Sequence, residues 1–188
     1  ISIAFALGAT GPTAAVGASA ALNRIGDAST PDVITVEAVI DASTVTSAGS
    51  LSVSAIESAS IGAYTVAGAG SFTGGEGVKV GFGGAGSGSG NEITTNTHAG
   101  VTGGSNATTL SGDITLNGTS DLAIKAVAGG LAVAGAIGSG TGVAVTFGAA
   151  VAVNSVQATT LVGVDGSCAT SVESVDLGFA PVKKASLP

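Results

Sequence analysis

Charged side chains are scarce in this chain of 188 residues, since Lys, Arg, Asp and Glu make up only 9% of it. A typical soluble domain holds roughly 25%. Five Lys and Arg stand against twelve Asp and Glu, which gives a net charge of −7. Basic side chains are needed to neutralise phosphates, so the composition excludes nucleic acid as a partner. The acidic balance suits a protein exposed to salt outside the cell.

Large and reactive side chains are rare as well. Aromatic residues account for 3%, Trp and Met are absent, and there is one cysteine, Cys168. A single cysteine excludes an internal disulfide framework, and we interpret Cys168 as a small buried or incidental residue rather than a nucleophile. The only histidine, His98, has no ligand or catalytic partner at a recognisable spacing, so we expect it at the surface or in a turn. No catalytic residues, no resident cofactor and no enzymatic activity are predicted.

A membrane-spanning helix is not expected, although the chain has no charge between Lys125 and Asp165 and this stretch is long enough to cross a bilayer. The stretch is rich in glycine, and residues 143–153 alternate with the period of a strand. No cluster of Lys or Arg flanks it. A membrane is therefore an unlikely partner.

What the chain does contain is small and apolar: hydrophobic residues make up 45% and there are 32 glycines. Small side chains let backbone layers approach closely, and Val, Ile and Thr favour strands. Alternating segments recur between turn signals such as Gly74-Gly75 and Gly103-Gly104. The sequence therefore predicts an all-β protein with strands at 33–40, 51–55, 78–82, 113–117, 122–126, 143–153 and 159–164.

A diverged repeat of about sixty residues organises the chain. Its anchors are Asn23, Asn91 and Asn154, each of which closes a Gly/Ala/Val-rich stretch and precedes Arg-Ile, Glu-Ile or Ser-Val. Such repeats stack because one unit cannot bury its apolar face alone. We expect each asparagine at a coil corner, where stacked copies would form a ladder. The predicted array spans 1–174 (part-unit 1–38, unit 39–99, unit 100–161, part-unit 162–174), followed by a linker or boundary segment at 175–188.

Two architectures fit these strands. In a parallel β-solenoid, each unit would make about three coils of some twenty residues. In an antiparallel sandwich or barrel, hairpins would connect the strands, and Asn117-Gly118 is the strongest hairpin dipeptide. Repetition, small residues and the lack of aromatics favour the solenoid.

The segment 36–55, followed by a Gly/Ala/Val run that ends in Val-Asn or Leu-Asn, resembles the repeats of giant secreted bacterial exoproteins and filamentous-haemagglutinin-like adhesins. The resemblance covers most of residues 1–167 and rests on composition. It implies a right-handed parallel β-helix within a longer polypeptide. It also implies a location outside the cell or at its surface, in a fibre that serves adhesion, biofilm or sheath formation.

Three functions remain open. The first is a structural or adhesive segment that associates with itself or with another surface or matrix protein. The second is a β-helix module that binds or cleaves carbohydrate, which would need clustered carboxylates with a base on one face. The third is a subunit buried in a larger assembly. Calcium is a further candidate ligand at Asp41 and Asp165, which occupy equivalent repeat positions, although Thr102 interrupts their column.

Overall fold

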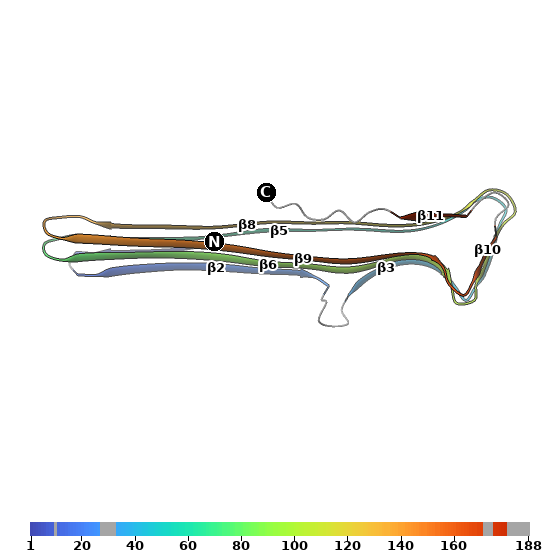
Figure 1. Ribbon diagram of the computed structural model, residues 1–188, viewed down its shortest axis with the longest axis horizontal. Helices are drawn as coiled ribbons and strands as arrows, with labels where there is room; N and C mark the ends of the chain where they lie inside the picture. Colours follow the sequence, from blue (N-terminus) through green and yellow to red (C-terminus); the bar gives the residue numbers. More distant parts are fainter. Residues whose placement is uncertain (10, 27–32, 171–174, 180–188) are drawn as a thin grey trace. The chain divides into compact units, whose positions relative to one another are not determined.

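The computed structural model describes residues 1–9, 11–26, 33–170 and 175–179, which form strands and no helix, so the all-β prediction is confirmed. Within these residues nothing helical is available that would reach across a bilayer. The strands, seen in Figure 1, are β1 (Ser2–Gly8), β2 (Thr13–Ile25), β3 (Ile34–Asp41), β4 (Thr44–Ser47), β5 (Leu51–Thr73), β6 (Lys79–Thr102), β7 (Asn106–Thr109), β8 (Ile114–Ala136), β9 (Gly142–Val164), β10 (Cys168–Thr170) and β11 (Val175–Phe179).

Three sheets hold these strands. One has the order β1-β5-β8-β11 and a second the order β10-β7-β4, while in the third β6 pairs with β2, β3 and β9. The pairings of β1, β3, β4, β10 and β11 are all parallel, as in a solenoid-like fold. The antiparallel alternative needed a hairpin at Asn117-Gly118, and it is contradicted because both residues lie inside β8.

The register shows how the repeat is used. Ser2 lies opposite Ala67, Thr44 opposite Asn106, and Asn106 opposite Cys168, so one repeat separates paired residues. A repeat therefore forms one layer, here called a rung, instead of the three coils of twenty residues that we expected. The reason is strand length: β5, β6, β8 and β9 each span 23 or 24 residues without a turn. Rung 1 is β1–β4, rung 2 is β5–β7 and rung 3 is β8–β10.

The chain divides into two compact units that are not successive repeats, because each takes part of every rung. Unit 1 comprises Ile1–Asn23, Ile61–Asn91 and Lys125–Asn154, and unit 2 comprises Arg24–Ser60, Glu92–Ile124 and Ser155–Pro188. The serial units expected at 39–99 and 100–161 do not coincide with this division.

The interior of unit 1 is built mainly from small side chains, and Ile61, Lys79 and Asn91 are the larger residues buried in it. Its buried cluster consists of alanines, Ala15, Ala67, Ala69 and Ala85. A Cβ on Gly130 would lie 2.8 Å from the carbonyl oxygen of Ala149 and 3.1 Å from that of Ala85. The close approach of backbone layers that the small side chains predict is therefore present here.

The interior of unit 2 contains larger side chains. Val101, Ile114 and Leu116 are fully buried, and Val53 and Val162 join them in one cluster. Burying a side chain of this size contributes about 1.5–3 kcal/mol. Unit 2 therefore has a conventional hydrophobic core.

Glycines make the turns between long strands. Gly75 and Gly77 precede β6 with φ of 99° and 90°, and Gly138 and Gly140 precede β9 with 124° and 105°. Only glycine adopts such values without strain. The turn predicted at Gly74-Gly75 is therefore found.

The segment expected to be a linker, 175–188, begins as part of the array. Val175 to Phe179 form β11, which pairs with Ile114 to Gly118 of β8. The residues that led us to expect a linker, Pro181, Lys183, Lys184 and Pro188, lie outside the described residues.

Candidate functional site

The three anchor asparagines form a ladder across the rungs. The Nδ2 of Asn23 donates to the Oδ1 of Asn91 at 2.8 Å, and the Nδ2 of Asn91 donates to the Oδ1 of Asn154 at 2.8 Å. All three lie inside strands β2, β6 and β9, so their expected place at a coil corner is wrong. In-register parallel strands set equal side chains about 4.8 Å apart, which lets amides bond without left-handed backbone.

A second ladder was not predicted. The backbone N–H of Ser43 donates to Ser105 Oγ at 3.0 Å, and the N–H of Ser105 donates to Ser167 Oγ at 2.9 Å. The Ser105 hydroxyl in turn donates to the carbonyl oxygen of Ile40 at 3.1 Å. The signal was present in the sequence as the recurring Asp-x-Ser of 41–43 and 165–167. Both ladders fix the register of the rungs.

In the column of Asp41, Thr102 and Asp165, a hydrogen bond joins the side chains of rungs 1 and 2. Thr102 Oγ1 donates to Asp41 Oδ1 at 2.9 Å. Across the described residues, no group of three His, Cys, Asp or Glu side chains is arranged to hold a metal ion.

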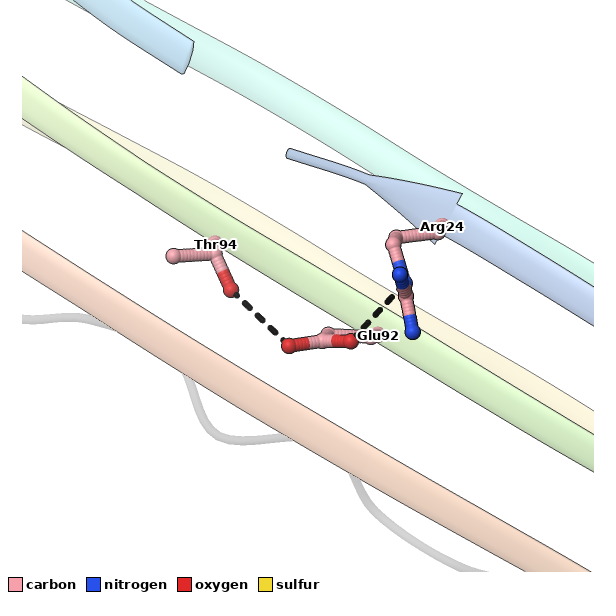
Figure 2. A network of polar contacts seen from close by, with 3 residues as sticks. All are labelled: Arg24, Glu92 and Thr94. Carbon is pink, nitrogen blue, oxygen red and sulfur yellow. Dashed lines mark hydrogen bonds and ion pairs between the residues drawn. The ribbon is translucent and has the colours of Figure 1, made fainter. Parts of the chain in front are cut away.

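A polar row follows alternate residues of β6 in unit 2: Glu92, Thr94, Asn96 and His98. Arg24 of β2 places its Nε 3.0 Å from Glu92 Oε2, and Thr94 Oγ1 donates to Glu92 Oε1 at 3.4 Å, as Figure 2 shows. In the unit 1 half of the same strand the corresponding alternate residues are Val80, Phe82 and glycines. These alternate residues of β6 thus change from apolar to polar beside Asn91.

A small polar groove of about 390 Å³ lies on this row. Its lining includes Glu37, Asn96, His98 and Thr159. His98 Nδ1 lies 3.9 Å from Glu37 Oε1. We expected His98 at the surface or in a turn, and it lies within strand β6 with its imidazole 23% exposed. Glycoside hydrolysis ordinarily uses two carboxylates across one bond, whereas this groove is lined by one.

Two ionisable groups are buried without an opposite charge in their hydrogen bonds. Glu57 Oε2 accepts from Thr97 Oγ1 at 2.9 Å and from Ser120 Oγ at 3.2 Å, inside unit 2. Lys79 Nζ, inside unit 1, donates to the carbonyl oxygens of Gly75 at 3.0 Å and Ser139 at 2.6 Å. Glu57 and Lys79 therefore each connect rung 2 to rung 3 or to the turn within it. Neither residue was singled out from the sequence.

The outward faces of unit 1 carry exposed large apolar side chains. Their number is high for one compact unit: Ile1, Ile3, Phe5, Leu7, Val16, Leu22, Tyr64, Val66, Val78, Phe82, Val127, Leu131, Val133, Ile137, Val143, Val145, Phe147, Val151 and Val153. We call these residues the apolar surface. Contiguous patches of this kind on soluble proteins mark interaction sites.

Glycines shape the apolar surface into ridges and a groove. The Phe5 ring lies over Gly70, 2.7 Å from where a Cβ would stand, and the Phe72 ring lies over Gly135 at 2.8 Å. Between the side chains of β1 and β8, the glycines of β5 leave an apolar groove of about 430 Å³. Leu131 forms part of its wall.

Cys168, which we expected to be a small buried or incidental residue, lies in β10 and is exposed. No protein-family model, no curated protein and no solved structure matches this chain. Its function must therefore be inferred from the rungs, the ladders and the surfaces described above.

Proposed function

We propose that this chain is a structural, non-enzymatic segment of a bacterial cell-surface or extracellular matrix protein, and that it associates with itself to build a fibre or sheath. The observation that carries the proposal is the apolar surface of unit 1. Unit 1 has only three charged residues, Glu76, Lys79 and Lys125, and Lys79 is buried. A surface so poor in charge is stable in water only when another surface covers it.

The magnitudes support self-association. Leu131 and Phe147 are each 68% exposed and Leu7 is 76% exposed. Full burial of one such side chain contributes about 1.5–3 kcal/mol. Covering several of them in one contact offsets an association cost of about 4–15 kcal/mol. The outward-facing charged and polar side chains of unit 2 would remain in solvent.

The remaining features of the proposal come from the resemblance and from general rules. Right-handed winding is expected, because crossovers between parallel strands of one sheet are right-handed in about 98% of cases. An extracellular location agrees with the acidic composition and with the adhesin-like repeats.

Sedimentation velocity over a range of concentrations tests the proposal, together with electron micrographs of the concentrated protein. We expect association of the wild type, and a shift of at least about tenfold to higher concentration in the double variant Val151→Lys/Val153→Lys, which charges the apolar surface. Tenfold corresponds to about 1.4 kcal/mol. Both residues are about 60% exposed on β9, so the substitutions should leave folding intact.

The matched control is Gln157→Lys/Thr159→Lys, which adds the same charges to exposed alternate positions of the same strand, in unit 2. It should associate like the wild type. A wild-type chain that stays monomeric at high concentration and forms no fibre would overturn the proposal. Equal effects of the two double variants on association would show that the apolar surface does not drive self-association.

A carbohydrate-binding role is the second candidate, and the polar groove favours it. The groove offers a carboxylate, an amide and an imidazole from Glu37, Asn96 and His98, which are groups that bond sugar hydroxyls. Calorimetric titration with neutral and acidic oligosaccharides tests it, with Glu37→Gln/Asn96→Ala as the comparison. Binding that survives the double variant would exclude the groove as the site.

A further inference from the structure

We propose that separate copies of this chain stack head to tail, with rung 3 of one copy pairing in parallel with rung 1 of the next. The proposed partner is a second copy of this chain, and its register is the one that joins successive rungs within the chain. This inference rests on the self-association proposed above and specifies its axis, polarity and register.

The first observation is the open edge of rung 3. In the sheet of β2, β3, β6 and β9, strand β9 pairs with β6, and among the described residues no strand pairs with its other edge. Residues 142–153 of β9 are all exposed. Unpaired N–H and C=O groups along such an edge are a template for another strand. On the far edge of the same sheet, β2 likewise pairs with β6.

The second observation is the polarity of the serine ladder in unit 2. Ser43 of rung 1 donates its N–H to Ser105 of rung 2, which donates its N–H to Ser167 of rung 3. Both bonds run from the lower rung to the higher. The next step would join the N–H of Ser167 to the Oγ of Ser43 in a second copy.

The asparagine ladder in unit 1 has the same polarity by itself. Asn23 donates to Asn91, and Asn91 donates to Asn154. The Nδ2 of Asn154 therefore faces out of rung 3 as a donor, and the Oδ1 of Asn23 faces out of rung 1 as an acceptor. Each unit, taken separately, offers a donor at one end and the matching acceptor at the other.

This complementarity selects the partner. Two copies meeting through the same end would bring donor against donor or acceptor against acceptor. Rung 3 against rung 1 repeats a contact already made twice in the chain. Such a head-to-tail contact uses two different surfaces, so it continues from copy to copy as a filament.

Strand β11, which pairs with rung 3 and so begins a fourth rung, leaves room for this stacking. It pairs with Ile114 to Gly118 of β8. Strand β1 pairs with Ala67 to Thr73 of β5. Contacts between β5 and β8, such as Ser54 with Asn117, place equivalent residues one repeat apart. The β1 of a second copy would therefore lie along the later residues of β8, beyond those that β11 covers.

Cysteine cross-linking tests the register directly. Thr44, Asn106 and Cys168 are equivalent positions of the three rungs, and both Thr44 and Cys168 are exposed. Head-to-tail stacking places Cys168 opposite Thr44 of the next copy, within the 4.4–6.8 Å Cα separation of a disulfide. We expect Thr44→Cys, mildly oxidised, to give a ladder of covalent multimers on a non-reducing gel, at least tenfold above the controls.

Three controls define the outcome. The wild type has one cysteine and can form only dimers. Ala48→Cys adds a second exposed thiol outside the register and should give few multimers. Asn106→Cys should close a disulfide with Cys168 inside one chain, which proves that opposed thiols react. Its failure to close would contradict the register and overturn the proposal.

The outcomes separate this inference from the proposed function. Multimers from Thr44→Cys alone support head-to-tail stacking. A chain that associates in sedimentation but yields no more multimers from Thr44→Cys than from Ala48→Cys overturns the stacking and leaves self-association standing. A chain that neither associates nor cross-links overturns both.

Discussion

The two units of this protein differ in whether their large apolar side chains lie mainly in the interior or on the outer surface. Unit 1 has mainly small side chains inside and most of its Leu, Val and Phe outside, whereas unit 2 buries a cluster of Val, Ile and Leu and exposes fewer large apolar side chains. All charged residues other than Glu76, Lys79 and Lys125 belong to unit 2. The same repeat therefore supplies a conventional core in one unit and a surface for other molecules in the other.

The comparison also teaches what holds each unit together. Unit 2 gains stability from burial of large side chains. Unit 1 has little of that to gain, and depends more on strand pairing, on the ladder ending at Asn154 and on the carbonyl contacts of Lys79. Substitutions of a single kind should therefore have unequal effects in the two units.

The largest effect is expected from Leu116→Ala in unit 2. Leu116 is fully buried within the larger cluster, so the cavity and the lost burial should lower the free energy of unfolding by about 2–5 kcal/mol. Urea unfolding measures it, with Leu161→Ala, which removes a 56% exposed leucine, as the control. A loss below about 1 kcal/mol would contradict a conventional core in unit 2.

Gly130→Ala in unit 1 should cost about 1–3 kcal/mol for the opposite reason, because its methyl would press on the carbonyl oxygens of Ala149 and Ala85. Its neighbour Gly129 has no atom within 4 Å of the equivalent position. Gly129→Ala should therefore lie within about 0.5 kcal/mol of the wild type. Equal unfolding midpoints for the two variants would show that the layers of unit 1 have room to spare.

The smallest effect is expected from Glu92→Gln, which breaks the pair with Arg24 at the outer face of unit 2. The Arg24 side chain is 43% exposed, so solvent screens the pair. A loss of about 0.2–1 kcal/mol is expected, and it should shrink in 1 M salt. Glu76→Gln in an exposed turn of unit 1 is the comparison. A loss above about 2 kcal/mol for Glu92→Gln would assign the polar row a structural role.

Much of the fold follows from local chemistry. Alternation of Val, Ile and Thr predicts strands, and the glycines at 74 and 75 predict the turn that precedes β6. The number of coils per repeat could not be predicted in the same way. Continuous small residues permit a strand of any length, so the sequence near Asn117-Gly118 offered a hairpin that the neighbouring rungs override.

The candidate sites likewise separate into features that the sequence predicts and features that depend on the tertiary structure. Three asparagines at repeat spacing predict stacked side chains, because equal positions of parallel strands meet. The pairing of Glu37 with His98, and the burial of Glu57 and Lys79, depend on which residues of different rungs face each other. A single alternating pattern does not tell the two faces of a strand apart when both are small and apolar.

The sequence by itself determined that this protein is all-β, repetitive, poor in charge and built on recurring asparagines, since composition and spacing act locally. The tertiary structure alone decided that one repeat makes one rung, and that mainly small side chains lie inside unit 1 while most of its large apolar residues lie outside. The physical reason is packing. Where backbone layers approach until a carbonyl oxygen contacts glycine, there is little room for a large side chain, and most of these occupy the outer surface.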